Sequence, residues 1–206
     1  AESYSERIAV KIRTLELLSV LDMLCLVILI VIQTLAAMKM SVLNKLLEQR
    51  AYTDAHTGLP NKDACEVLLN NKETVAKHTA CMMFDLNNLK IINDTKGHSK
   101  GDQLILNFAR LLRNVIPQKD FVGRYGGDEF MVVIYNTSKT EIEDILKQLS
   151  REKDRLNSSG NNMPIDYACG WAISDADSEC TIQMLLDKAD YYMYENKQAY
   201  KKFKKS

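Results

Sequence analysis

The chain has 206 residues, of which 46% are hydrophobic and 26% charged, with 27 basic and 27 acidic side chains. This composition excludes collagen-like, disordered and disulfide-dense classes. The formal net charge of zero argues against a chain devoted to non-specific nucleic-acid binding, so we expect no nucleic-acid partner. Its five cysteines show no CxxC spacing and lie mostly in apolar runs, which favours buried free thiols.

The N-terminal part is dominated by an apolar segment that runs from Leu17 to Met38 with few interruptions. A helix of roughly 20 apolar residues crosses the hydrocarbon core of a bilayer, so this segment favours a transmembrane helix. A second interpretation stays open beside it. Apolar residues spaced alternately four and three apart from Val10 to Val42 would also form the seam of a parallel coiled coil.

A domain boundary is predicted near residue 50. Residues 40–52 continue the helical pattern without Gly or Pro, whereas residues 54–61 are rich in turn formers. We therefore expect residues 1–49 to form a transmembrane or signalling helix with its linker, and residues 50–206 to form one domain.

Periodicity predicts the elements of this domain in chain order. They are a helix at 61–78, a buried strand at 79–86, a helix at 101–116, hairpin strands at 121–125 and 130–135, a helix at 139–157, a strand at 164–174 and a helix at 181–200. Gly126 and Gly127 separate the hairpin strands, where the absence of Cβ would permit a tight reversal. This alternation predicts an α+β class with helices around one mixed sheet.

Two acidic residues stand at the ends of predicted strands. Asp85 closes the buried strand, and Asp128 directly follows the two glycines. Taken singly, each also fits an ordinary turn. If the strands are neighbours in one sheet, the two carboxylates converge and, with a backbone carbonyl, form a hard-oxygen site suited to Mg²⁺. Because Mg²⁺ usually bridges to substrate phosphates, the pattern indicates a nucleoside triphosphate or a similar ligand.

A polar stretch punctuated by glycine lies between these acids, from Lys90 to Asp102. Lys90 could neutralise phosphate charge. Asn93 and Asp102 offer an amide and a carboxylate that together match the donor and acceptor edge of guanine. The plainer alternative is an N-capped loop, since Asp102 also fits the first turn of the helix that we expect at 101–116.

Four motifs in one order resemble the GGDEF domains of bacterial diguanylate cyclases. Residues 126–130 read GGDEF, residues 54–61 resemble the family's opening DxLTGLxNR, residues 84–90 resemble DxDxFK, and residues 93–102 match NDxxGHxxGD. The resemblance covers residues 50 to about 202. It implies a palm-like central sheet, of nucleotide cyclase or ferredoxin-like type, that is flanked by helices and preceded by the long N-terminal helix.

This resemblance also implies an activity. In the family each domain binds one GTP and two domains meet face to face, so that the 3′-hydroxyl of each GTP attacks the α-phosphate of the other. Pyrophosphate leaves and cyclic di-GMP closes. The chain is thus expected to be a diguanylate cyclase, a nucleotidyltransferase that works as a homodimer with two Mg²⁺ per active site and Mn²⁺ as the alternative ion.

Carried over residue by residue, the resemblance assigns the metal to Asp85, the Leu86 carbonyl and Asp128. Asp128 would accept the hydroxyl proton, Lys90 would be the second catalytic residue, and Glu129 would support the hairpin or the site. The implied substrate-binding residues are Asn93, His98, Asp102, Gly126, Gly127, Lys197 and Lys201. The last two belong to a closing motif that resembles ADxALYxAK followed by GRN.

Several positions depart from the family pattern. Asn87 and Leu89 stand where the family usually has Asp and Phe, which puts full catalytic strength in doubt. Lys201 replaces the Arg of GRN and lacks its forked geometry, so phosphate binding there would be less rigid. Pro117 replaces the Arg of the RxxD product-inhibition motif, although Asp120 remains, so that feedback site should be impaired.

Two functions follow from these residues. The first is a cyclase tethered to the plasma (inner) membrane, controlled by an upstream sensor, with residues 50–206 in the bacterial cytoplasm where GTP is available. The alternative is a catalytically weak GGDEF domain that acts as a GTP-binding sensor or a dimerisation module.

Overall fold

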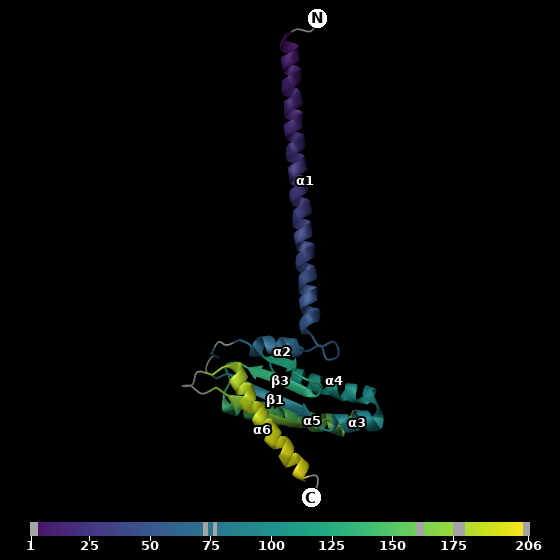
Figure 1. Ribbon diagram of the computed structural model, residues 1–206, viewed down its shortest axis with the longest axis vertical. Coiled ribbons are helices and arrows are strands. Elements are labelled where there is room, and N and C mark those ends of the chain that lie inside the picture. Colours follow the sequence, from purple (N-terminus) through teal and green to yellow (C-terminus); the bar gives the residue numbers. More distant parts are fainter. Residues whose placement is uncertain (1–3, 72–73, 76–77, 160–162, 175–179, 204–206) are drawn as a thin grey trace. The chain divides into compact units, whose positions relative to one another are not determined.

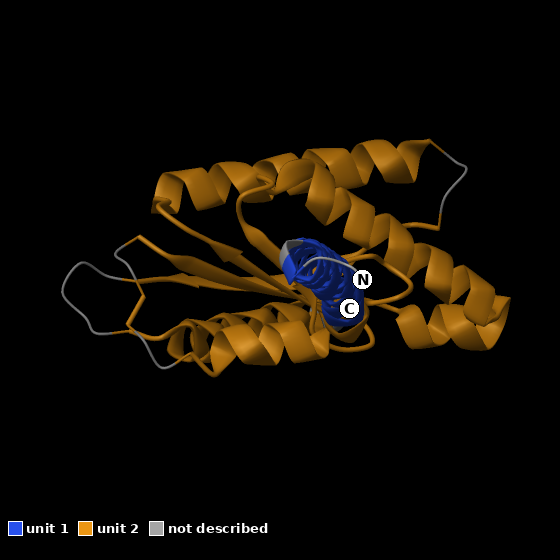
Figure 2. Ribbon diagram, turned by 90° about the horizontal axis from the view of Figure 1, so that it is seen from above, with its two compact units in different colours: residues 1–49 blue, residues 50–206 orange. Residues whose placement is uncertain are grey.

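The computed structural model describes residues 4–71, 74–75, 78–159, 163–174 and 180–203. It divides into two compact units, residues 1–49 and residues 50–206 (Figure 2). In the first unit, helix α1 (Tyr4–Tyr52) is continuous, and its large apolar side chains are exposed. By length and composition α1 could cross a membrane, which is a weak indication by itself. The predicted helical continuation through residues 40–52 is confirmed.

The second unit is built on a four-stranded sheet in the order β2-β3-β1-β4. Strands β1 and β3 lie side by side in it (Figure 1). Its strands are β1 (Ala80–Leu86), β2 (Phe121–Arg124), β3 (Glu129–Ile134) and β4 (Tyr167–Ile173), and every neighbouring pair is antiparallel. The mixed sheet predicted above is wrong, because β3 returns from its hairpin between β1 and β2 and separates two strands that run in the same direction. The order is that of a ferredoxin-like palm, so the predicted α+β class is confirmed.

The described residues of this unit form the helices α2 (Lys62–Leu69), α3 (Leu89–Lys96), α4 (His98–Val115), α5 (Lys139–Ser158) and α6 (Ile182–Phe203). Helix α2 ends at Leu69 rather than at residue 78, with Asn70 as its C-cap, because the apolar periodicity stops there. Part of the predicted continuation, at 72–73 and 76–77, lies outside the described residues. Helix α3 was not predicted, since its two turns are largely polar and only Ile92 is buried.

The start of α4 also differs from the prediction. The helix begins at His98, three residues early, because Gly97 adopts a φ of +84° and separates α4 from α3. Gly97 occupies the N-cap position, and Asp102 lies beyond the first turn. The prediction that Asp102 lies in the first turn of this helix is therefore wrong, which leaves its exposed carboxylate available for another role.

Helices cover both faces of the sheet. Because strand side chains alternate between faces, Met82 and Phe84 pack with α4 and α5, whereas Cys81 and Met83 pack with α2 and α6. This explains why β1 reads as an unbroken apolar run, since all seven of its residues are buried. By the same alternation, Asp85 belongs to the face that α6 covers.

The face of β4 under α6 carries small residues: Ala168, Gly170 and Ala172. A Cβ at Gly170 would overlap the backbone of α6 at Ala189 and Met193. This glycine therefore lets α6 lie directly on the sheet, and it places the last turns of α6 beside the end of β1.

Candidate active site

A cleft of about 480 Å³ opens where α6 passes the ends of β1 and β3. Asp85 and Glu129 are paired residues on these two strands, so their side chains emerge on the same face. Lys197 reaches the cleft from α6, and its Nζ lies 2.6 Å from Asp85 Oδ2. The complete lining consists of Asp85, Glu129, Asp187, Asp190, Tyr191, Met193, Tyr194, Lys197 and Gln198.

The cleft holds more negative than positive charge. Asp85 is nearly buried, with 7% of its side chain exposed, and its Oδ1 has no hydrogen-bond partner among the residues that the structure describes. Burial raises the pKa of Glu129, and the neighbouring charges of Asp128 and Asp85 raise it further. A single ammonium, from Lys197, is thus close to a group of carboxylates that repel one another.

These residues fit a hard divalent cation such as Mg²⁺ or Mn²⁺. A buried carboxylate oxygen without a partner is costly, and a bound cation would satisfy it. Asp128 is also close by, because its backbone carbonyl accepts a hydrogen bond from the Leu86 N–H at 2.9 Å. In the described part of the chain, no three His, Cys, Asp or Glu side chains form a complete metal site, so substrate oxygens would have to supply further ligands.

The residues expected to recognise guanine lie at the junction of α3 and α4. A Cβ at Gly101 would overlap the Asn93 side chain, so this glycine lets the Asn93 amide lie against α4. Gly101 is the residue directly before Asp102. His98, Asp102 and Lys90 are exposed in the same region of the chain. The junction therefore brings the Asn93 side chain beside Gly101, the residue before the exposed Asp102.

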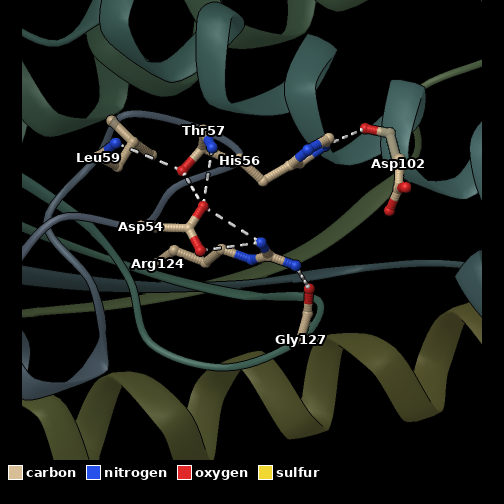
Figure 3. A network of polar contacts seen from close by, with 7 residues as sticks. All are labelled: Asp54, His56, Thr57, Leu59, Asp102, Arg124 and Gly127. Atoms are coloured by element: carbon tan, nitrogen blue, oxygen red, sulfur yellow. Dashed lines mark hydrogen bonds and ion pairs between the residues drawn. The ribbon is translucent and has the colours of Figure 1, made fainter. Parts of the chain in front are cut away.

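A polar network links the opening loop, the hairpin turn and this junction (Figure 3). Arg124 Nη1 lies 3.2 Å from each oxygen of Asp54, and Arg124 Nη2 donates to the Gly127 carbonyl at 2.8 Å. Burial alone would raise the pKa of Asp54, but the hydrogen bonds from Thr57 and the charge of Arg124 lower it overall. His56 Nε2 lies 2.9 Å from the Asp102 carbonyl oxygen, so one loop contacts both the turn and α4.

The structure does not support the conformational role predicted for the glycines of the hairpin turn, whereas their predicted role in substrate binding stays a prediction. Neither Gly126 nor Gly127 has a positive φ. A Cβ at Gly127 would meet nothing within 4 Å, and one at Gly126 would meet only the movable Glu129 side chain. The turn therefore does not need glycine for its own conformation. The open space beside Gly127 leaves the backbone accessible to a ligand.

Other predicted positions take structural roles or fall outside the description. Asp120 is buried, and its Oδ1 accepts a hydrogen bond from the Tyr135 N–H at 3.1 Å. Asn87 is buried and its Nδ2 has no partner. The backbone of Lys201 continues α6, but its side chain lies outside the described part of the chain.

Sequence reasoning missed two features of the site. Asp187 and Asp190 line the cleft, and their helical spacing from Lys197 was the signal that could have revealed them. The pairing of Arg124 with Asp54 had no local signal, because 70 residues separate the two.

The fold and the cleft together define a class: an antiparallel α+β palm whose carboxylates suit a cation and the phosphates it would carry. A sequence profile described as "Diguanylate cyclase, GGDEF domain" matches residues 51–202. The chain belongs to this GGDEF family.

Individual relatives carry different names. Signaling protein YkoW of Bacillus subtilis (strain 168) is 31% identical over 75% of this chain and 20% of its own length. Diguanylate cyclase DgcP of Escherichia coli (strain K12) is 30% identical over 75% of this chain and 47% of its own. Cyclic di-GMP phosphodiesterase PdeB of Shewanella oneidensis is 32% identical over 70% of this chain and 17% of its own. The chain spans less than half of each relative.

Solved structures agree in fold. The GGDEF domain of DgcB from Caulobacter crescentus, in complex with c-di-GMP, has a TM-score of 0.62 at 25% identity and covers 72% of this chain and 89% of its own. The coiled coil and GGDEF domain of the same protein reach a TM-score of 0.69 at 22% identity, over 81% of this chain and 91% of that one. The second likeness supports the fold alone.

Proposed function

We propose that the chain is a diguanylate cyclase, which condenses two GTP molecules into cyclic di-GMP and releases two pyrophosphates. The observation that carries this proposal is a cleft lined by Asp85, Glu129 and Lys197, in which one Asp85 oxygen contacts Lys197 and the other has no partner among the described residues. Membership of the GGDEF family supplies the reaction class.

The chain's own residues divide the work. Asn93 and Asp102 hold the guanine edge, with His98 lining that pocket. The backbone at Gly126 and Gly127, with open space beside Gly127, admits the triphosphate. Lys90, Lys197 and Lys201 stabilise phosphate charge. In this scheme Asp85, the Leu86 carbonyl and Asp128 hold Mg²⁺ or Mn²⁺, two ions per active site, with Glu129 opposite Asp85. When bound, the cation supplies electrostatic stabilisation of the phosphates.

The chemical step needs two domains. The 3′-oxygen of one GTP forms a bond with the α-phosphorus of the other, the bond from that phosphorus to the oxygen bridging it to the β-phosphate breaks, and pyrophosphate leaves. Asp128 takes the hydroxyl proton. Because one domain offers one guanine site, the second GTP comes from a second copy of the chain, and the same exchange in the other direction closes the ring. Positioning and charge stabilisation account for most of the acceleration in such transfers.

In the same proposal, α1 crosses the plasma (inner) membrane and residues 50–206 lie in the cytoplasm, where an upstream sensor controls the arrangement of the dimer. The exposed apolar surface of α1 supports this, because it needs lipid or another helix to cover it. Membrane fractionation before and after carbonate washing tests the anchoring. Release of the chain by carbonate would contradict it.

A second candidate is a domain that binds GTP with little turnover, as a sensor or dimerisation module. The buried Asn87 in place of the usual Asp favours it, as do relatives named as phosphodiesterases. One experiment separates the two functions. The purified full chain in detergent is incubated with GTP and Mg²⁺, and cyclic di-GMP is measured by mass spectrometry, with Asp85→Asn as the inactive control. Formation of cyclic di-GMP supports the cyclase, and GTP binding without product supports the sensor. If the chain neither binds GTP nor forms product, both functions are contradicted.

A further inference from the structure

In the cleft, Lys197 forms an ion pair with Asp85, the carboxylate that the proposed reaction requires for its cation. Lys197 Nζ lies 2.6 Å from Asp85 Oδ2, and 7% of the Asp85 side chain is exposed. We propose that Lys197 makes cation binding depend on nucleotide binding. In the nucleotide-free domain its ammonium is the counter-ion of Asp85 and opposes a divalent cation, and the phosphates of an incoming GTP draw it away. This inference rests on the proposed cyclase function.

The first step of the argument concerns the two oxygens of Asp85. Oδ2 contacts Lys197, whereas Oδ1 has no partner and could accept a cation. An ammonium and a divalent cation on the two oxygens of one carboxylate would lie only a few ångströms apart and repel each other strongly, because the buried site screens them poorly. The cation therefore binds weakly while Lys197 stays.

The second step concerns the freedom of Lys197 to leave. Its side chain is 27% exposed at the cleft and carries its charge on a flexible four-carbon stem. The backbone of α6 is held against the sheet at Gly170, so the side chain can swing without moving the helix. A phosphate group near the cleft offers the ammonium a partner of higher charge than Asp85.

The third step is the charge that remains. Once Lys197 turns to the phosphates, Asp85, Glu129, Asp187 and Asp190 line a cleft with no cation of the chain's own among its lining residues. The vacated carboxylate then favours a divalent ion, so nucleotide raises cation affinity. By linkage, the cation raises nucleotide affinity by the same factor.

Mn²⁺ binding to the full chain in detergent tests this inference. Free Mn²⁺ is followed by electron paramagnetic resonance, without nucleotide and then with 3′-deoxy-GTP, which lacks the attacking hydroxyl. Without nucleotide, Lys197→Met should bind Mn²⁺ about tenfold more tightly than the natural chain, because the opposing charge is gone. With 3′-deoxy-GTP this advantage should disappear.

Two further variants sharpen the comparison. Lys188→Met removes an exposed lysine of α6 that does not line the cleft, so it should leave Mn²⁺ affinity unchanged. Lys197→Arg keeps the charge and should retain weak Mn²⁺ binding in the absence of nucleotide. Circular dichroism confirms folding, and Lys197→Gln replaces Lys197→Met if the latter is misfolded.

The outcomes separate this inference from the function on which it rests. Equal or weaker Mn²⁺ binding by Lys197→Met without nucleotide overturns the inference, even if the natural chain binds Mn²⁺ and 3′-deoxy-GTP together. An equal gain in Lys188→Met also overturns it, since general charge would then be the cause. Failure of the natural chain to bind 3′-deoxy-GTP with Mn²⁺ overturns the proposed function and the inference with it.

Discussion

Two acid–base pairs in residues 50–206 join distant segments, and they differ in how completely they are satisfied. Asp54 and Arg124 are 70 residues apart, and Asp85 and Lys197 are 112 apart. Asp54 contacts Arg124 through both oxygens and also accepts the Thr57 N–H at 2.8 Å and its hydroxyl at 2.6 Å. Asp85 contacts one ammonium and leaves its Oδ1 without a partner.

This difference separates a structural pair from a functional one. The Asp54 pair fixes a loop against the hairpin turn, and its many hydrogen bonds offset the cost of partial burial. The Asp85 pair sits among carboxylates that repel one another, so the native fold retains an unfavourable arrangement that a ligand could relieve. Unsatisfied charge in a cleft therefore identifies this candidate site better than the number of charged residues does.

The largest expected effect comes from removing the functional carboxylates. Asp85→Asn and Asp128→Ala should each lower cyclic di-GMP synthesis by a factor on the order of 1000 or more, because cation and phosphate binding are lost together. The thermal unfolding midpoint of Asp85→Asn should change little, since the loss of its ion pair with Lys197 opposes the relief of its repulsion with Glu129. Product formation and thermal unfolding are measured on the same samples. Normal turnover in either variant would contradict the metal assignment.

A smaller effect is expected where α6 meets the sheet. Gly170→Ala should destabilise the domain by about 1–3 kcal/mol, because its Cβ would overlap the backbone at Ala189 and Met193. Activity should fall as well, because a shift of α6 would displace Lys197 from the phosphates that it is proposed to stabilise. Gly127→Ala is the matched control, since its Cβ meets nothing within 4 Å, and its stability should be unchanged. Urea unfolding compares the two, and equal stabilities would contradict the close packing of α6.

Breaking the Asp54–Arg124 pair should have a smaller effect on stability than Gly170→Ala. Asp54→Asn should lower the free energy of unfolding by about 1–2 kcal/mol, because Arg124 would keep its position with a weaker partner. Asp144→Asn is the control. It removes an exposed pair with Lys147, whose side chains are 65% and 62% exposed, and should change stability by less than about 0.5 kcal/mol. If Asp54→Asn is as stable as this control, the pair contributes no more than a surface contact.

The smallest expected effect is the pH dependence of the difference in unfolding free energy between the natural chain and Asp54→Asn. Because the folded state lowers the pKa of Asp54, its contribution is fully present above the unfolded pKa of about 4 and is lost as pH falls through the lower folded value. The stability gap between the natural chain and Asp54→Asn should therefore shrink below about pH 4. Urea unfolding at a series of pH values measures it. A gap that stays constant down to the lowest pH would show that the Asp54 charge is not its source.

Much of this protein could be predicted from its sequence because the relevant signals are local. The apolar run of α1, the buried strand β1 with Asp85 near its end and the helical periodicity of α5 each follow from residues close in the chain. The motifs likewise name the chemistry of the site, since carboxylates, an amide and lysines at fixed spacing indicate a cation and a phosphorylated guanine ligand.

Tertiary structure decided which of these residues meet. Period-two alternation predicts that Asp85 lies on the same face of β1 as Cys81 and Met83. Only the strand order, in which β3 lies between β1 and β2, places Glu129 opposite Asp85. The Asp54–Arg124 pair and the close packing of α6 against Gly170 both depend on segments that are far apart in sequence. Long-range contacts form only when the whole core packs, so local sequence patterns do not predict them.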